Sequence, residues 1–372
     1  MNPIRLTLFF TRTASLETWM RNGSMTREVA LYVRLCQMGV KVSFITYGNR
    51  KDLDIARNIP EIEVACNYWN LPLRLYELLI PILHWKIFRN TDVIKTNQTN
   101  GSVVALKVSR IWRKPLIARS GFMWSEFAER AVLTHELRLA RKIEKKVFHE
   151  SRKIVVTTPA MKDAISENYD IDLRKITVIP NYVLTEVFSP QPVSVVENRI
   201  CFVGRLVEQK NLDTLLQACE GMPVELHLVG TGHLHASLQD SALKKGVRLI
   251  LHGNLPHHQL PALICSSSVF VLPSMYEGHP KALLEAMSCG VAVLGTDVPG
   301  IREQIVHGET GWLCKSDAQS LRNGVQYLLS NPDLRKKIGA NARNFIEDNC
   351  SLNRVAEMEF SVLKKIKNGE NN

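Results

Sequence analysis

Short apolar runs alternate with helix-like patterns from one end of this chain to the other, and this alternation constrains the fold most. Segments such as Met25–Met38 and Glu126–His149 have the spacing of amphipathic helices, and the apolar runs between such segments are typical of buried strands. The strand-like runs are Leu6–Phe10, Lys41–Thr46, Leu116–Ala118, Lys153–Thr157, Ile176–Ile179, Ile200–Val203, Val224–Val229, Leu249–Leu251, Val269–Leu272 and Val291–Gly295. Strand–helix alternation predicts parallel sheets with helices on both faces, which is the α/β class.

The alternation is interrupted by a polar segment near residues 181–198 that contains Pro190-Gln191-Pro192. A chain of 372 residues is long for one core and suits two domains. We therefore expect two doubly wound, Rossmann-like domains that face each other across a cleft, with the ligand site at the carboxyl ends of the strands. The expected parts are an N-terminal domain at 1–185, a C-terminal domain at 186–350 and a helix at 351–368 that packs back on the N-terminal domain.

The positive charge of the chain is concentrated in its first half. Residues 1–185 hold 29 Lys and Arg against 17 Asp and Glu, whereas the remainder holds 18 against 19. A basic domain beside a neutral one indicates a phosphate-bearing partner or an anionic membrane surface. A solvated basic surface without a partner is the alternative.

Several classes of protein are disfavoured by simple features. The eight cysteines are scattered singly, without a C-x-x-C pair, which fits a reducing cytosol and indicates neither a zinc knuckle nor a redox dithiol. The first ten residues have too short an apolar run for a secretory signal and are typical of a strand. The most lipid-like segment, Leu71–Phe88, contains Arg74, Glu77 and Lys86 and is therefore not expected to span a membrane. We expect a cytoplasmic chain.

The most specific motif is the segment from Pro273 to Met287, in which two glutamates stand eight residues apart. A Gly-x-Pro turn places Glu277 on the loop after a strand, and Glu285 lies one turn into the next helix. The backbone amides near 278–282 then point out of a helix N-terminus, where a diphosphate binds well. Two surface glutamates around a turn are the alternative interpretation.

This segment resembles the E-x7-E signature of the retaining glycosyltransferases of family 4, which have the GT-B fold. The match continues through residues 288–300 to Glu303 and 307–313. The resemblance implies a nucleotide diphosphate sugar, UDP- or GDP-linked, as donor, with Glu277 near the transferred sugar and Glu285 on the ribose hydroxyls. Carboxylates suit both tasks because each accepts hydrogen bonds from two vicinal hydroxyls. The other residues of the segment expected at the donor are Gly278, His279, Pro280, Lys281, Ala282 and Leu283.

Upstream, residues 203–212 match the family's strand-to-loop element, and here Gly204, Arg205 and Lys210 would lie at the donor diphosphate. The leaving nucleoside diphosphate gains negative charge as the glycosidic bond breaks, and fixed cations stabilise that charge. Gln209 stands where the family often has Glu. No Asp-x-Asp triplet follows a strand, so we expect no metal and no cofactor besides the nucleotide sugar as co-substrate.

Three glycine-containing loops complete the expected donor site. Gly230-Thr231-Gly232 ends a strand and looks like the family's loop beside the nucleotide, although such a pair by itself commonly closes a turn. Asn254 and Leu255 look like the loop that faces the base through its backbone. Gly23, in the first half, resembles the family's glycine loop after the first strand, where backbone approaches a ligand closely.

The motifs indicate fewer residues for the acceptor than for the donor. Where the family often has a histidine after a mid-domain strand, this chain has Arg119 and Ser120, which are the candidates for that place. By resemblance the acceptor is a glycan or a lipid-linked molecule, in bacterial surface polysaccharide or lipopolysaccharide synthesis. The cationic, apolar segment Leu71–Arg89 would fit a peripheral position on the inner face of the cytoplasmic membrane; core packing of 71–82 is the alternative.

Two other functions are compatible with parts of this pattern. Another GT-B enzyme, such as a nucleotide-sugar epimerase, would share the donor motifs and release a changed nucleotide sugar without an acceptor. A phosphorylase-like enzyme normally needs a pyridoxal lysine, for which no motif is present. A basic nucleic-acid-binding protein fits the charge, but no aromatic-basic reader motif is present, so we expect no nucleic-acid partner.

Overall fold

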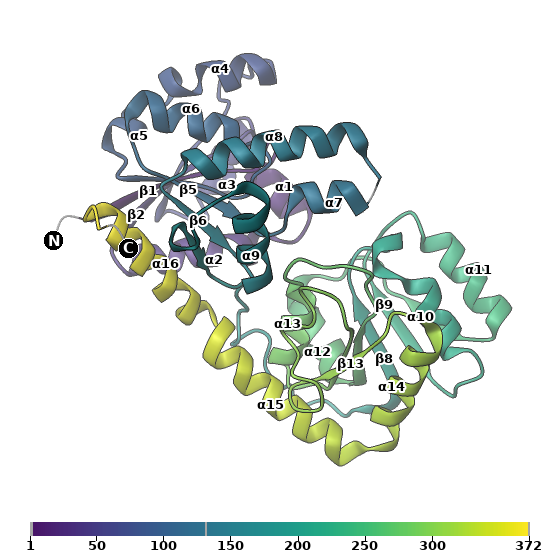
Figure 1. Cartoon of the computed structure of the whole chain (residues 1–372). Helices are drawn as coiled ribbons and strands as arrows, with labels where there is room; N and C mark the ends of the chain where they lie inside the picture. Colours follow the sequence, from purple (N-terminus) through teal and green to yellow (C-terminus); the bar gives the residue numbers. More distant parts are fainter. Residues whose placement is uncertain (1–2, 131, 371–372) are drawn as a thin grey trace. The chain divides into compact units, whose positions relative to one another are not determined.

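Two parallel sheets organise the chain, one in each of two units (Figure 1). The computed structural model describes residues 3–130 and 132–370. Unit 1 consists of Met1–Pro180 with Leu352–Asn372, and unit 2 consists of Asn181–Ser351. Residues 1 and 2, at the start of the expected N-terminal domain, lie outside the described residues.

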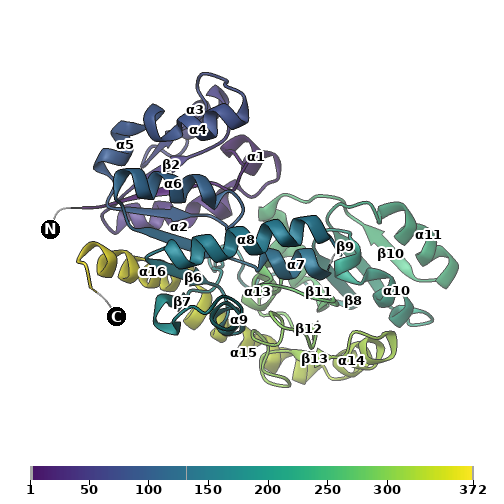
Figure 2. The ribbon, with the colours of Figure 1, turned by 45° about the horizontal axis from the view of Figure 1, so that its top comes forward.

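Over the described residues, the sheet of unit 1 has the strand order β3-β2-β1-β4-β5-β6-β7 and is parallel throughout. The strands are β1 Ile4–Phe9, β2 Val40–Ile45, β3 Ile62–Ala65, β4 Val93–Thr96, β5 Leu116–Ser120, β6 Lys153–Val156 and β7 Ile176–Val178. The helices are α1 Leu16–Arg21, α2 Met25–Gln37, α3 Arg50–Ala56, α4 Leu73–Leu83, α5 Trp85–Asn90, α6 Ser102–Trp112, α7 Trp124–Arg130, α8 Thr134–Glu150, α9 Pro159–Tyr169 and α16 Leu352–Lys367. Helices α6 and α8 cover one face of this sheet and α2 and α16 the other (Figure 2).

Unit 2 repeats the plan with a parallel sheet of order β10-β9-β8-β11-β12-β13. The strands are β8 Val196–Val203, β9 Glu225–Val229, β10 Arg248–Leu251, β11 Ser267–Leu272, β12 Val293–Thr296 and β13 Trp312–Cys314. The helices are α10 Leu212–Cys219, α11 His235–Lys245, α12 Leu260–Cys265, α13 Lys281–Ser288, α14 Ala318–Ser330 and α15 Pro332–Cys350. All residues of β11 and β12 are buried, as expected for parallel strands covered on both faces. The α/β class with two doubly wound domains is confirmed.

The strand order of each sheet reverses once, and this reversal positions the site. In unit 1 the chain moves outward from β1 to β3 and then returns to pair β4 with β1. In unit 2 the same reversal pairs β11 with β8. At such a switch point the loops after two adjacent strands diverge, so a ligand is bound at the carboxyl ends of those strands.

The boundary between the units lies slightly before the expected one at residue 185. Asn181 donates its amide to the carbonyl of His279 (2.8 Å), and the backbone N–H of Val183 donates to Cys350 (2.8 Å). Phe188 is fully buried in the core of unit 2. These contacts attach residues 181–188 to unit 2, where the sequence alone showed only a polar, proline-containing segment.

The last helix, α16, returns to unit 1 and contacts α2, β1 and β4. Its Glu359 forms an ion pair with Lys95 of β4 at 2.5 Å, with 2% and 0% of the two side chains exposed. Lys367 donates to the carbonyl of Pro3 (2.8 Å) and pairs with Asp92 (3.2 Å). Segments near the beginning and the end of the described residues therefore belong to one unit.

One expected element is wrong in detail. The helix expected at Glu126–His149 is two helices, α7 and α8, because Val132 takes a positive φ of 57° and the N–H of Leu133 bonds back to Ala128 (2.9 Å). A left-handed residue directly after the last turn ends a helix. Strands β3 and β4 were missed because a charged or polar residue interrupts the apolar run of each, and β13 because it has only three residues.

Candidate active site

The reversal in unit 2 brings the two main donor motifs together. The loop after β8 carries Lys210, and the loop after β11 carries Glu277; the two side chains form an ion pair. Only 12% of the lysine side chain and 7% of the glutamate side chain are exposed. A nearly buried ion pair at the carboxyl ends of adjacent parallel strands places a cation and a carboxylate where a nucleotide is expected.

The loop of Glu277 is held by hydrogen bonds that the sequence did not predict. The hydroxyl of the buried Ser274 donates to Glu277 Oε1 (2.7 Å). The amide of Gln209 donates to the carbonyl of Tyr276 (2.8 Å), and the N–H of Met275 donates to the carbonyl of Gln209 (2.9 Å). Gln209 therefore joins the two loops through a donor that an ionised glutamate lacks.

Glu285 lies one turn into α13, as expected, and only 4% of the residue is exposed. The Nε2 of His257 bonds to its Oε1 at 3.1 Å, and the His257 ring packs against Phe188 with 4.8 Å between ring centroids. A buried carboxylate held by a neighbour has a fixed direction, which suits recognition of a hydroxyl pair. His257 was not among the residues expected at the site.

The start of α13 is shaped by a close contact with the following loop. Gly300 has a φ of +83°, and a Cβ on it would lie 2.1 Å from the carbonyl oxygen of Gly278. The carboxylate of Glu303 accepts from the N–H of Gly300 (3.2 Å). Pro280 is the N-cap residue of α13, and His279 beside it is buried. The loop that contains Pro299 and Gly300 therefore supports the backbone around Glu277 and Gly278.

Two further glycines allow neighbouring loops to approach at the same sheet edge. A Cβ on Gly230 would lie 1.9 Å from the carbonyl oxygen of Gly204, and one on Gly232 would lie 2.0 Å from that of Leu206. The N–H of Gly230 donates to the carbonyl of Gly253 (2.7 Å). The structure thus gives Gly230 and Gly232 a packing role between loops.

The remaining donor residues expected in unit 2 differ in their surroundings. Arg205 is exposed, and its guanidinium forms no ion pair within the described part of the chain. Asn254 is exposed, whereas Leu255 is half-buried against the core. Of the α13 segment, Lys281 and Ala282 are half-buried and Leu283 is fully buried. Leu283 can therefore contribute only its backbone.

In unit 1, Arg119 and Ser120 lie at the carboxyl end of β5, whereas helix α1 separates Gly23 from β1. Arg119 Nη1 donates to the carbonyl of Asn97 (3.3 Å), and the buried Ser120 donates its hydroxyl to Phe122 (2.8 Å). Gly23, with a φ of 66°, ends α1 directly before α2. An Arg12–Glu77 ion pair (2.6 Å) after β1 was missed, and its hydrogen bond raises the pKa of Arg12.

Comparison with known families decides what this arrangement belongs to. A family model described as "Glycosyltransferase Family 4" matches residues 22–187, and one described as "Glycosyl transferases group 1" matches residues 185–345. The two matches overlap at residues 185–187 and together cover residues 22–345, which include the loops of Arg119, Lys210 and Glu277. The chain belongs to the family 4 glycosyltransferases. The resemblance drawn from the motifs is confirmed.

Among curated proteins, this glycosyltransferase is similar to alpha-maltose-1-phosphate synthase of Mycolicibacterium smegmatis. The two are 26% identical over 254 residues, which is 60% of this chain and 66% of that protein. It is also 35% identical over 139 residues to the amylovoran biosynthesis glycosyltransferase AmsK of Erwinia amylovora, which is 33% of this chain and 34% of that protein. The matches thus cover between a third and two thirds of these relatives.

Solved structures show the same fold for this glycosyltransferase over nearly its whole length. Sucrose-phosphate synthase from Thermosynechococcus elongatus superposes with a TM-score of 0.83 at 18% identity, covering 99% of this chain and 100% of that one. Anabaena Alr3699/HepE, solved in complex with UDP and glucose, superposes with a TM-score of 0.79 at 17% identity, covering 97% and 99%. The GT-B fold is confirmed.

No helix among the described residues of this glycosyltransferase is both long enough and apolar enough to cross a bilayer. The apolar segment that the sequence singled out forms α4, of 11 residues, followed by the short α5. Its inner side is buried, with Tyr76 and Ile80 fully inaccessible, as core packing requires. Its outer side is not covered.

Proposed function

We propose that this glycosyltransferase moves a sugar from a nucleoside diphosphate sugar to an acceptor with retention of the anomeric configuration. The observation that carries the proposal is the Lys210–Glu277 ion pair at the switch point of unit 2, directly before the N-terminus of α13. A diphosphate bound there meets Lys210, the exposed Arg205 and the first backbone amides of the helix. Glu285 would accept hydrogen bonds from the ribose hydroxyls.

In the proposed step the bond between the anomeric carbon and the diphosphate oxygen breaks. The acceptor oxygen forms a new bond to that carbon on the same face, and its proton moves to the departing phosphate oxygen. Arg205, Lys210 and the amides at α13 stabilise the charge that develops on the leaving group, without a requirement for a metal ion. Glu277 holds Lys210 and lies beside the sugar.

Binding of nucleotides gives the direct test of the donor site. A ligand present at a hundredfold its dissociation constant stabilises the native state by about 2.7 kcal/mol. We expect UDP or GDP, and its sugar, to raise the thermal unfolding temperature by several degrees, while CDP and ADP do not. Alr3699/HepE was solved with UDP and glucose, which favours UDP as the first nucleotide to try.

The product distinguishes the competing reactions. NMR of the product with an accepted sugar is expected to show the anomeric configuration of the donor, and EDTA is expected to leave the rate unchanged. Inversion at the anomeric carbon would refute the retaining mechanism. A changed nucleotide sugar formed without an acceptor would instead identify an epimerase. No stabilisation by any nucleotide would remove the basis of the proposal.

We further propose a lipid-linked acceptor reached at an anionic membrane surface. On α4 the residues Leu75, Leu78 and Ile82, spaced along one side of the helix, are 41%, 58% and 67% exposed. Trp85 of α5 and Ile111 of α6 extend this apolar face, at 43% and 55% exposed. The face borders a groove of about 590 Å³. A contiguous exposed apolar patch rimmed by polar residues commonly marks an interaction surface.

The charges around this apolar face favour a membrane as its partner. Lys107 lines the groove and reaches the carbonyl of Leu78 (3.2 Å), and the segment from 71 to 114 is rich in basic side chains. Basic residues around an inserted apolar face are attracted to anionic lipid headgroups. A peripheral position on the inner face of a bacterial cytoplasmic membrane, in surface polysaccharide or lipopolysaccharide synthesis, follows from this proposal. The similarity to AmsK supports that setting.

Vesicle sedimentation tests the apolar face. The double variant Leu78→Gln with Ile82→Gln is expected to bind phosphatidylglycerol vesicles at least about tenfold more weakly, since each apolar side chain contributes roughly 1.5–3 kcal/mol when buried. Leu243→Gln is the matched control, because Leu243 of α11 is 77% exposed and lies in unit 2. Equal binding by the double variant and the control would refute this use of the face.

A further inference from the structure

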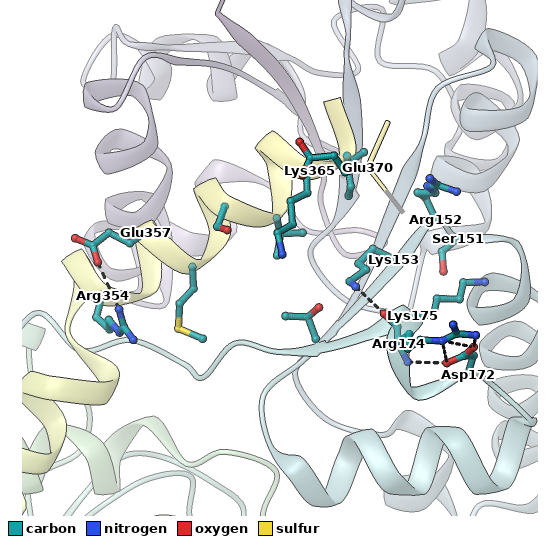
Figure 3. Close-up of a pocket in the computed structure, with 15 residues that line it drawn as sticks. Ser151, Arg152, Lys153, Asp172, Arg174, Lys175, Arg354, Glu357, Lys365 and Glu370 are labelled. Atoms are coloured by element: carbon teal, nitrogen blue, oxygen red, sulfur yellow. Dashed lines mark hydrogen bonds and ion pairs between the residues drawn. The ribbon is translucent and has the colours of Figure 1, made fainter. Parts of the chain in front are cut away.

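Unit 1 contains a second pocket, of about 910 Å³, that the proposed transfer reaction does not use. It lies between α16 and the segments that lead into β6 and β7 (Figure 3). Lys153 is the first residue of β6 and Lys175 immediately precedes β7, so the pocket is at the amino ends of these strands. The acceptor-side residues Arg119 and Ser120 lie at the opposite, carboxyl edge of the same parallel sheet.

The pocket carries an excess of positive charge. Its lining includes six basic side chains and three acidic ones. The basic lining residues are Arg152, Lys153, Arg174, Lys175, Arg354 and Lys365. Two of them form ion pairs with a nearby carboxylate. Arg174 pairs with Asp172 (2.6 Å for the closest atoms), and Arg354 pairs with Glu357 (3.7 Å).

The central lysines are not neutralised in this way. Lys153 donates to the carbonyl of Arg174 (2.7 Å) and Lys175 to the carbonyl of His149 (2.7 Å), and both acceptors are uncharged. Lys365 has no acidic partner among residues 3–130 and 132–370, and Figure 3 shows it and Lys153 directed toward the same space. Three lysines therefore line one cavity without a carboxylate of their own.

The protonation equilibria agree with this arrangement. Burial lowers the pKa of Lys153, and the neighbouring charges of Lys365, Lys162 and Arg152 lower it further. Burial also lowers the pKa of Lys175. A lowered lysine pKa means that the charged form is disfavoured by its surroundings, and a bound anion would reverse that effect.

One wall of the pocket is apolar. Met358, Val362 and Ile366 of α16 are spaced four residues apart and line it from one side of the helix. The hydroxyls of Ser361 and Thr177 also line the space. A pocket of this volume accommodates a small organic molecule rather than a lone ion, since such sites usually measure about 300–1,000 Å³.

We propose that this pocket binds a phosphorylated organic anion at a site separate from the donor site. Its phosphate or diphosphate would lie among Lys153, Lys175 and Lys365, and its organic part would lie on the apolar side of α16. Phosphate oxygens accept charge-assisted hydrogen bonds from lysine at short range. The donor site is in unit 2, so the two sites share no residue.

Calorimetric titration with inorganic pyrophosphate at constant ionic strength tests the site. The titration is made in a Lys210→Ala background, in which the donor site is weakened, so that failure of the proposed transfer function does not affect the result. We expect one pyrophosphate site to remain in this background. Adding Lys365→Gln is expected to weaken pyrophosphate binding at that site about tenfold or more. Lys364→Gln is the matched control, because Lys364 is exposed on the same helix but does not line the pocket.

The outcomes separate clearly. Loss of binding in Lys365→Gln with retention in Lys364→Gln supports the pocket. Equal affinity in both variants would show nonspecific attraction to a basic surface, and no binding in the Lys210→Ala background would also overturn the proposal. Vesicles of phosphatidylglycerol that compete with pyrophosphate would identify a lipid phosphate as the source of the anion, and competition by soluble sugar phosphates alone would identify a free one.

Discussion

Replacing Lys210 with alanine is expected to lower the rate of sugar transfer by about 10²–10³-fold, the usual effect of removing one group that stabilises charge developing in a transition state. The substitution also leaves the nearly buried carboxylate of Glu277 without its cation, held only by the hydroxyl of Ser274. Glu277→Gln keeps the shape of the side chain but removes the charge, and a comparable loss of turnover is expected. Steady-state rates with a saturating nucleotide sugar provide the measurement.

The matched control for Lys210→Ala is Glu208→Gln, two residues earlier in the same loop. Glu208 pairs with His233, but 67% and 62% of these side chains are exposed, so the loss of their ion pair changes little. Circular dichroism and the unfolding temperature show whether each variant is folded. Unchanged turnover in a folded Lys210→Ala enzyme would remove Lys210 from the mechanism.

Glu359→Gln is expected to destabilise unit 1 by about 3–5 kcal/mol, because it leaves the fully buried ammonium of Lys95 without a counter-charge. The double variant Lys95→Met with Glu359→Leu should recover most of that free energy, since an apolar pair of similar size needs no desolvation of charge. Urea unfolding followed by tryptophan fluorescence reports mainly on unit 1, where all tryptophans but Trp312 lie.

The free energy of unfolding of Glu359→Gln is expected to depend on pH in a definite direction. Burial lowers the pKa of Lys95, and the charge of Glu359 opposes that effect. Without Glu359 the folded pKa falls further below that of the unfolded chain. Between these two pKa values the unfolded state binds the extra proton, so the free energy of unfolding should rise with pH. The deficit of Glu359→Gln should therefore be smaller at pH 9 than at pH 7.

An exposed ion pair serves as the control for the buried one. Arg141 and Glu129 approach to 3.1 Å with more than half of each side chain exposed. Glu129→Gln is expected to change the free energy of unfolding by less than about 1 kcal/mol at either pH. A loss in Glu359→Gln no larger than this would mean that the buried pair does not hold α16 to β4.

Much of the fold was predictable because it depends on local pattern. Buried parallel strands such as β1, β6 and β11 are continuous apolar runs, and their alternation with helices indicates a doubly wound sheet. The strands that were missed are short or contain polar residues. In β4, Lys95 occupies a buried position only because Glu359, far along the chain, neutralises it.

The motifs also identified residues before their contacts were known. The spacing of Glu277 and Glu285 around a Gly-x-Pro turn predicted Glu277 on a loop and Glu285 in a helix. In the structure Glu277 lies on the loop after β11, and Glu285 lies in α13. Their roles in transfer remain predictions. The partners Ser274, Gln209 and His257 carried no signal of their own, because isolated polar residues near a loop are common and only their directions make them specific.

By itself, then, the sequence determined the α/β class, the two-domain plan, the family and the two glutamates of the donor motif, all of which depend on spacing along the chain. Only the tertiary structure decided that β8 lies beside β11, which brings Lys210 to Glu277, and that α16 returns to cover β4. It also decided which side of α4 remains exposed and which lysines share a pocket. These properties depend on contacts between distant segments, and hydrophobic periodicity does not specify which segments meet.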